Sequence, residues 1–268
     1  WWMLAFGLLH GIVFSGDIIG AYGLVAVIFA EVIVMRRAWA RILAGSLIAT
    51  LSLMGITMGG AMMGREPMVL EYHGPMSLNA WYPLVSFGSW LVATPATVLT
   101  ALVVPCVMIG VGVARWGFLQ DPRGRGALLA GIAFGGLAFG ALGGAPFALM
   151  QLDWAFSNSA AWSYPLFHAS GVAGACGWLA LLALVGGGPR EKLGTVCAFL
   201  SAIGRRSMTA YLSQTLLFIL IFSVLGACGV RSLGVAVSGL IAAGVWALIG
   251  LGCVIAEALG SSRGPAEW

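Results

Sequence analysis

Two side chains that could carry out acid–base chemistry, His10 and Asp17, lie seven residues apart near the beginning of the chain. Both are embedded in apolar sequence, where ionisable groups are costly and commonly functional. If one helix continued through both positions, their spacing of nearly two turns would place them on one face. A carboxylate can hold an imidazole in one tautomer, and the ring can then act as a general base. The competing interpretation is an interfacial histidine followed by an aspartate that caps the next helix.

Two further polar residues, Asp153 and His168, fall at the same ends of the apolar segments as this pair. We expect them to line an outward-facing pocket together with His10 and to bind substrate there. All three histidines of the chain, including His73, lie on this side, but they lack the spacing of metal ligands. The sequence therefore predicts a substrate pocket without a metal site.

A second polar group surrounds a pair of arginines at the start of a later apolar segment. Arg205 and Arg206 are followed by Thr209, Tyr211 and Gln214. One interpretation is structural, with the polar side chains bonding to a neighbouring helix. The other is that the guanidinium groups and these side chains hold a phosphate-bearing ligand. The residue pattern leaves both open.

Eight apolar segments position these residues. The hydrophobic fraction of the chain is 60%, and the charged fraction is 8%, about a third of that in a soluble domain. A membrane-spanning helix needs about 20 apolar residues. The fold expected for the whole chain, 1–268, is an all-α polytopic transmembrane helix bundle that forms a single domain. We assign its spans, about eight, to residues 2–13, 18–34, 42–62, 91–113, 127–150, 166–185, 208–225 and 233–255.

The basic residues lie mainly on every second connection between these segments. Of the 13 Lys and Arg residues, all except Arg65 and Arg231 follow an even-numbered segment. The positive-inside rule therefore places both chain ends in the cytoplasm. The net charge of +4 reflects this topology, and no basic stripe interleaved with stacking aromatic residues indicates nucleic-acid binding.

Glycines are concentrated in the fifth segment, residues 127–150, where many are four residues apart. Small residues at this spacing let helix backbones approach closely. We expect Gly136 and Gly140 to lie in a helix–helix contact, and the alternative is a sliding surface or a slot for an acyl chain. Pro95, Pro105 and Pro146 lie inside apolar segments, where each frees a backbone carbonyl and can kink its helix.

Four motifs, in order along nearly the whole chain, resemble those of a family of bacterial inner-membrane proteins. Residues 7–10 read GLLH, residues 16–22 read GDIIGAY, residues 204–215 read GRRSMTAYLSQT and residues 264–268 read GPAEW. They are similar to the GLLH, GDILxxY, GRMALTNYLxQS and GPLEW motifs of the YeiB-like family, also called domain of unknown function 418. Ala210 replaces the usual asparagine of that family, and Arg206 replaces an apolar residue.

The resemblance implies a multi-pass protein of the bacterial inner membrane. The family carries further sequence before GLLH, so the resemblance also implies that this chain is the C-terminal portion of a longer membrane protein. The expected partners are then the lipid bilayer and that N-terminal part, with an oligomer left open. The family's distant similarity to membrane-bound acyltransferases suggests transfer of an acyl group from cytoplasmic acyl-CoA, a co-substrate, to an extracytoplasmic acceptor, with no other cofactor.

The resemblance also suggests roles for particular residues. His10 and Asp17 are the expected catalytic residues, and Tyr22 joins Asp153 and His168 in substrate binding. The expected acyl-CoA site comprises Arg205, Arg206, Thr209, Tyr211 and Gln214. The alternatives are a small-molecule transporter or exporter and a non-catalytic membrane subunit.

Overall fold

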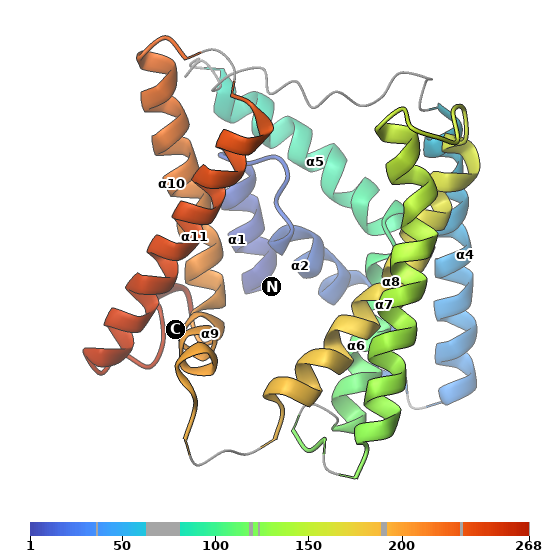
Figure 1. The fold of residues 1–268 in the computed structure, drawn as a ribbon. Helices are drawn as coiled ribbons and strands as arrows, with labels where there is room; N and C mark the ends of the chain where they lie inside the picture. Colours follow the sequence, from blue (N-terminus) through green and yellow to red (C-terminus); the bar gives the residue numbers. More distant parts are fainter. Residues whose placement is uncertain are drawn as a thin grey trace. The chain divides into compact units, whose positions relative to one another are not determined.

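The computed structural model describes residues 1–35, 37–62, 81–117, 120–122, 124–188, 192–230 and 233–267. His73 and the other residues of the connection 63–80 lie outside these ranges, and so does Arg123. The described residues contain helices and no strand, which confirms the all-α class. The helices are α1 (Trp2–Gly11), α2 (Ile19–Ile28), α3 (Ala30–Val34), α4 (Ala38–Met62), α5 (Tyr82–Thr100), α6 (Val103–Trp116), α7 (Gly126–Gln151), α8 (Ala160–Gly186), α9 (Thr195–Gly204), α10 (Ser207–Ala227), α11 (Val235–Ala258) and the 3₁₀ helix η1 (Pro265–Glu267) (Figure 1).

The chain divides into two compact units. The first comprises Trp1–Val69 and Phe87–Pro189, and the second comprises Leu70–Ser86 and Arg190–Trp268. The first unit therefore contains α1 to α8, apart from the beginning of α5, and the second contains α9 to α11. The His10–Asp17 pair belongs to the first unit and the Arg205–Arg206 pair to the second.

Six helices are long and apolar enough to cross a membrane, judged by length and composition. They are α4, α5, α7, α8, α10 and the Ala236–Ala258 part of α11. The helices α1, α2, α6 and α9 are also apolar, but they contain only 10 to 14 residues, which is short for a simple span. These lengths support a multi-pass membrane protein, and the count of eight spans stays a prediction.

The fourth predicted segment, residues 91–113, is divided between two helices, so the prediction of one continuous span was wrong. The chain leaves the helical path at Leu102, which has a left-handed φ of 56°. The physical cause is Pro105, which has no N–H to donate to the Ala101 carbonyl and whose ring would clash with that carbonyl. The α5 helix also begins earlier than expected, at Tyr82, and so includes Trp90, which the sequence had placed in a connection.

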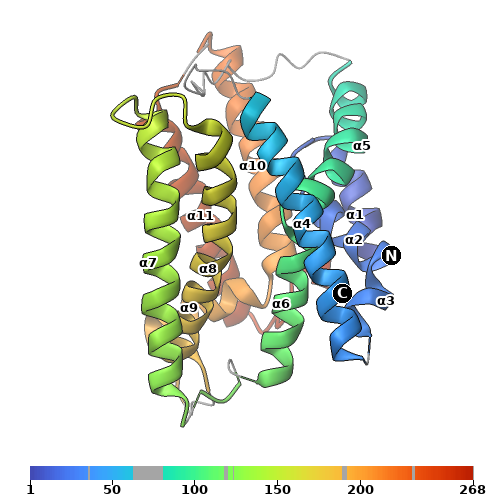
Figure 2. The same ribbon diagram turned by 90° about the vertical axis from the view of Figure 1, so that its right-hand side faces the viewer.

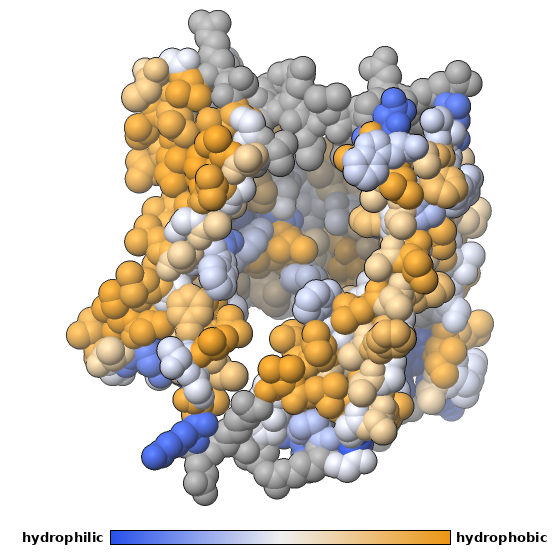
Figure 3. Space-filling model, viewed as in Figure 1, coloured by the Kyte–Doolittle hydropathy of each residue, from blue (hydrophilic) through white to orange (hydrophobic). Residues whose placement is uncertain are grey.

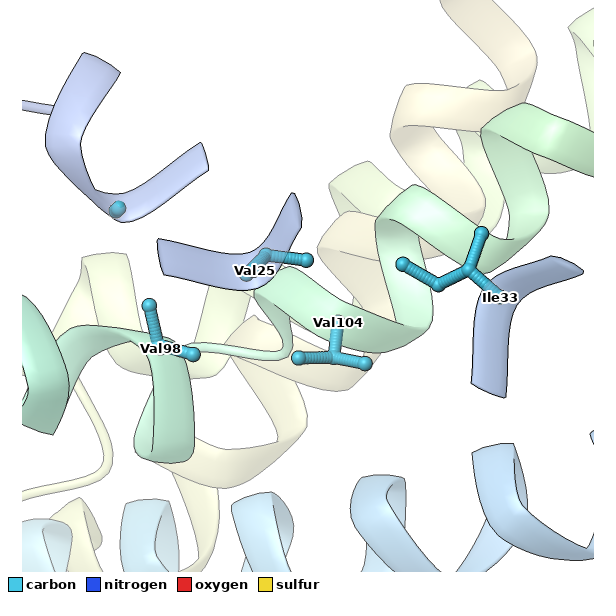
Figure 4. Packing of buried hydrophobic residues seen from close by; sticks show 5 residues of the cluster. Val25, Ile33, Val98 and Val104 are labelled. Atoms are coloured by element: carbon cyan, nitrogen blue, oxygen red, sulfur yellow. The ribbon is translucent and has the colours of Figure 1, made fainter. Parts of the chain in front are cut away.

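The interrupted helices build one buried hydrophobic cluster of the first unit, and α7 and α8 contribute another. Val25 of α2, Ile33 of α3, Val98 of α5 and Val104 of α6 pack in one cluster with Ala21 (Figure 4). Val98 and Val104 lie on either side of the break after α5, yet both are almost fully buried. The break therefore lets one stretch of sequence contribute two side chains to the same core.

The α7 and α8 helices lie side by side along a glycine seam (Figure 2). A Cβ added at Gly136 would lie 2.5 Å from the Ala173 carbonyl oxygen, and one added at Gly140 would lie 2.9 Å from the Gly174 Cα. Both neighbouring atoms are backbone atoms of α8. The predicted close packing of Gly136 and Gly140 is thereby confirmed.

Only one side of the glycine-rich helix forms this seam. A Cβ added at Gly131 or Gly135 would meet no atom within 4 Å, and both positions are exposed. The four-residue glycine spacing is therefore present on two faces of α7, and only the face that contains Gly136 and Gly140 contacts α8.

Large apolar side chains cover outward faces of helices in both units (Figure 3). Phe134 and Leu142 of α7 are 80% and 74% exposed, and Leu240 of α11 is 74% exposed. Extensive apolar surface of this kind is unusual in contact with water and suits a hydrocarbon environment. The exposed faces thus agree with the membrane assignment made from composition.

Candidate functional site

His10 and Asp17 meet across the turn between α1 and α2. The α1 helix ends at Gly11, so it does not continue to Asp17 as the spacing argument assumed. The His10 Nδ1 atom lies 2.7 Å from Oδ1 of Asp17, and the two side chains are only 4% and 0% exposed. Because a carboxylate can only accept hydrogen bonds, the imidazole donates from Nδ1.

The Asp17 carboxylate accepts hydrogen bonds from four donors. Besides His10, the Ile19 N–H donates to Oδ1 at 3.2 Å, and the Gly20 N–H donates to Oδ2 at 2.5 Å. The indole Nε1 of Trp90 donates to Oδ2 at 3.3 Å. The two backbone bonds cap the first turn of α2, so Asp17 combines both roles considered from the sequence: it caps a helix and it pairs with His10. Four donors match the acceptor capacity of a carboxylate, which makes its complete burial tolerable.

Glycines create the close approach that this site requires. A Cβ added at Gly7 would collide with the Gly20 backbone where α1 crosses α2, and one added at Gly20 would lie 2.4 Å from Cζ2 of Trp90. A Cβ added at Gly11 would lie 2.5 Å from Cγ of Trp90. Glycine at these positions therefore lets the indole reach the Asp17 carboxylate.

Trp90 is a site residue that the sequence analysis missed. Only 4% of the residue is exposed, and it follows Asp17 by 73 residues. One signal could have indicated its burial, because Trp90, Thr94 and Val98 recur every four residues along α5 and are all buried. That pattern marks an inward helix face, but it does not identify the aspartate that the face contacts.

Phe14 packs against the imidazole from the connecting turn. Its ring centroid lies 5.6 Å from that of His10, and the side chain is 41% exposed. A Cβ added at Gly16 would lie 2.9 Å from the Phe14 ring, so the small residue there leaves space for the ring. Phe14 thus contacts the buried imidazole and is itself partly exposed.

The three residues expected to bind substrate have distinct surroundings in the first unit. Tyr22, in α2, is 42% exposed and lines an otherwise apolar cavity of about 370 Å³ together with residues of α2, α3 and α6. Asp153 follows the end of α7, is exposed and has a left-handed φ of 55°. His168, in α8, packs edge-on against Tyr164 and Phe167, with centroid distances of 4.6 Å and 5.2 Å. A shared pocket with His10 stays a prediction.

In the second unit, Arg205 and Arg206 converge on one carboxylate. Nη2 of Arg205 lies 2.7 Å from Oε1 of Glu257, and Nη1 of Arg206 lies 2.9 Å from Oε2. The Arg206 side chain is only 3% exposed, whereas that of Arg205 is 45% exposed. Arg206 also donates to the backbone carbonyls of Ala202 and Ser261. It therefore ties the junction of α9 and α10 to the end of α11.

Thr209 binds the segment that follows α11. Its N–H donates to Oε1 of Glu267 at 2.9 Å, and its hydroxyl donates to Oε2 at 2.6 Å. The same hydroxyl accepts the Ala266 N–H at 3.0 Å. A Cβ at Gly264 would collide with the Thr209 side chain and the Glu267 carboxylate. The carboxylate thus lies at the N-terminal turn of α10, where backbone N–H groups favour a negative charge.

These contacts give a structural role to two motifs that are distant in sequence. The GRRSMTAY motif supplies Arg206 and Thr209, and the GPAEW motif supplies Gly264 and Glu267. The intramolecular bonds support the structural interpretation of Arg206 and Thr209. Tyr211 and Gln214 lie further along α10 and are half-buried. Binding of acyl-CoA by this group of residues stays a prediction.

Within the described parts of the chain, no group of three or more His, Cys, Asp or Glu residues is arranged to hold a metal ion. Each of the two described sites brings together paired protein side chains. In the first unit this is a buried imidazole–carboxylate pair, and in the second it is a guanidinium–carboxylate network.

Comparison with known proteins identifies one family. A family model described as "Protein of unknown function (DUF418)" matches residues 113–268, which is more than half of the chain. The match includes the Arg206–Glu257 and Thr209–Glu267 contacts and begins after the His10–Asp17 pair. No curated protein and no solved structure matches the chain.

Proposed function

The chain belongs to the DUF418 family, whose function is unknown, and we propose that it is a membrane-bound acyltransferase. It passes an acyl group from cytoplasmic acyl-CoA to a hydroxyl acceptor on the outer side of the bacterial inner membrane. The observation that carries the proposal is the 2.7 Å distance between His10 Nδ1 and Asp17 Oδ1 in a buried setting. A carboxylate on Nδ1 makes Nε2 the basic atom of a neutral imidazole, as in general-base catalysis.

In the proposed reaction, Nε2 of His10 takes the proton of the acceptor hydroxyl while the hydroxyl oxygen attacks the thioester carbonyl. A C–O bond forms, the C–S bond breaks, and the departing CoA sulfur takes the proton from the imidazolium. Asp17 keeps the other ring proton at Nδ1 and stabilises the imidazolium. Asp17 does not touch substrate in this scheme and is therefore a positioning residue. The acceptor reaches the ring when Phe14, which packs on it, moves aside.

The substrate pocket of this proposal includes Tyr22, Asp153 and His168. Tyr22 is supported by its position on an apolar cavity in the first unit. For Asp153 and His168, the support is their expected location on the same side of the membrane as His10. We propose that they form the opposite wall of the pocket, where their polar groups orient the acceptor.

The proposed site for acyl-CoA lies in the second unit. Arg205 is the residue that meets the phosphates first, because its side chain is about half exposed at 45%. Arg206 and Thr209 fix the start of α10 to the end of α11 and the following segment through their bonds to Glu257 and Glu267. Tyr211 and Gln214 complete the proposed site on α10. A guanidinium is well suited to phosphate oxygens because its N–H groups form paired hydrogen bonds.

We further propose eight spans with both chain ends in the cytoplasm, in a single membrane domain. The support is the distribution of Lys and Arg, which places all but two of the 13 on alternate connections.

The test is acyl transfer from acetyl-CoA by the purified full-length protein. His10→Gln should reduce kcat/KM by about 10²–10⁴-fold, the usual contribution of a general base. Asp17→Asn should reduce kcat less than His10→Gln does and leave KM unchanged, because Asp17 stabilises the imidazolium without touching substrate. Trp90→Phe should have a smaller effect of the same kind, since it removes one donor to Asp17.

Asp121→Asn is the matched control, because Asp121 is an exposed aspartate after α6 and outside the proposed site. It should leave both kcat and KM unchanged. Undiminished transfer by folded His10→Gln would exclude this histidine as the base. An unchanged kcat in folded Asp17→Asn would assign Asp17 to helix capping alone.

A further inference from the structure

An apolar cavity of about 220 Å³ lies between α6, α7 and α8 in the first unit. Its lining includes Ile109 and Trp116 from α6, Leu129 from α7, and Cys176 and Ala183 from α8. The lining side chains are aliphatic apart from the Trp116 indole and the Cys176 thiol. Such a cavity offers nothing to a polar ligand and accommodates hydrocarbon.

The cavity begins at one end of the three helices and extends inward. Trp116 is the last residue of α6, Leu129 lies one turn after α7 begins, and Ala183 lies one turn before α8 ends. From Trp116 to Ile109, and from Ala183 to Cys176, the lining continues for seven residues, or about 10 Å at the rise of an α-helix. The cavity therefore has the form of a slot that follows the helices away from their ends.

Two arginines lie at the end where the slot begins. Arg115 directly precedes Trp116 and is exposed, and Arg125 is the exposed N-cap residue of α7. Nη1 of Arg125 donates to the Trp116 carbonyl oxygen at 2.7 Å, which fixes this guanidinium beside a residue of the lining. Positive charge is thus located next to the beginning of an apolar slot.

We propose that this slot binds one acyl chain of an anionic phospholipid whose phosphate contacts Arg115 and Arg125. Guanidinium groups pair with phosphate oxygens, and basic pockets between membrane helices on the cytoplasmic side bind anionic headgroups. The connection between α6 and α7 is one of those that the positive-inside rule assigns to the cytoplasm. Charge and apolar shape therefore select the same ligand, a lipid with a negatively charged headgroup.

The test uses the purified full-length protein in nanodiscs of phosphatidylcholine with increasing fractions of phosphatidylglycerol. The unfolding temperature should rise with phosphatidylglycerol and reach a plateau, because a ligand that binds the native state stabilises it. Free glycerol phosphate added to phosphatidylcholine discs should give no rise, since it has no acyl chain. A rise with glycerol phosphate would identify a phosphate site and overturn the lipid proposal, and equal stability in both lipids would overturn it as well.

Two variants, each with a control, test the contribution of the slot and that of the positive charge separately. Cys176→Phe fills the slot and should remove the response to phosphatidylglycerol, whereas Leu182→Phe, at a position of α8 that is 55% exposed, should keep it. Arg115→Gln should raise the phosphatidylglycerol fraction at half-maximal response about fivefold. Arg37→Gln, the same change at another exposed arginine, should not. If Cys176→Phe and Arg115→Gln both respond like the unsubstituted protein, the proposal is wrong.

Discussion

The glycine seam between α7 and α8 predicts opposite effects for the same substitution at adjacent residues. Gly136 and Gly135 both lie in the interior of α7, and both sites can be changed to alanine. At Gly136 the added methyl group would lie 2.5 Å from the Ala173 carbonyl oxygen and 2.9 Å from the Gly177 Cα. At Gly135 it would meet no atom within 4 Å. Gly135→Ala is therefore a matched control with identical chemistry.

The expected magnitudes follow from two opposing terms. Alanine in place of glycine stabilises a helix interior by about 0.5–1 kcal/mol, because the unfolded chain loses freedom. At Gly136 this gain is offset by overpacking, which costs about 1–3 kcal/mol where the neighbours cannot move. The colliding atoms belong to the α8 backbone, so relief requires the two helices to separate. We expect a net loss of about 1–2 kcal/mol for Gly136→Ala and a gain of about 0.5–1 kcal/mol for Gly135→Ala.

Thermal unfolding in one detergent, monitored by circular dichroism, measures this difference. The two variants should differ by about 1.5–3 kcal/mol, and at about 2–4 °C per kcal/mol for a chain of this size their unfolding temperatures should differ by about 3–12 °C. Gly136→Leu should lower the temperature further, because its longer side chain cannot fit between the backbones. Equal unfolding temperatures for Gly135→Ala and Gly136→Ala would refute the close approach of α7 and α8.

Two other predictions concern the topology and the segment after α11. On a cysteine-free background, a cysteine at Asn158 should react with an impermeant maleimide from outside, and one at Arg123 should not; the reverse pattern would contradict the assigned orientation. Glu267→Gln should weaken the binding of the segment after α11 to α10 by about 1–2 kcal/mol, because it removes charge-assisted hydrogen bonds to Thr209. Amide hydrogen exchange at Thr209 and Ala266 should then accelerate. The control Glu31→Gln, at an exposed position of α3, should leave this exchange unchanged. Unaltered exchange in Glu267→Gln would show that the carboxylate does not hold the segment.

The His10–Asp17 pair was predictable from its residue types, although the assumed geometry was wrong. Spacing suggested one continuous helix, whereas the two side chains meet across a turn that Asp17 itself stabilises by capping α2. In one continuous helix the two residues would share a face but lie about 10 Å apart along the axis, so the 2.7 Å contact between them depends on the turn. The competing interpretation of Asp17 as a cap was also confirmed, because its two oxygens can accept several donors at once.

The partners of the second polar group could not be found in the same way. Arg206 and Glu257 are 51 residues apart, and Thr209 and Glu267 are 58 apart. Glu257 had an apparent partner in Arg263, only six residues away. The resemblance drew attention to both motifs, but it contained no indication that they bind each other.

The sequence by itself determined the properties that depend on composition and on local bonding. These are the apolar helices, the alternation of basic connections and the family. Pro105 marked a place where a helix could be interrupted through its missing N–H, although Pro95 and Pro146 lie inside α5 and α7 without interrupting them. The tertiary structure alone decided which glycine face of α7 packs on α8, that Trp90 reaches Asp17, and that Arg206 is buried against Glu257. The physical reason is that hydropathy and proline geometry act within a few residues, whereas packing and ion pairing depend on distances between segments remote in sequence. Those distances are set only when the helices pack together and side-chain volumes exclude the alternatives.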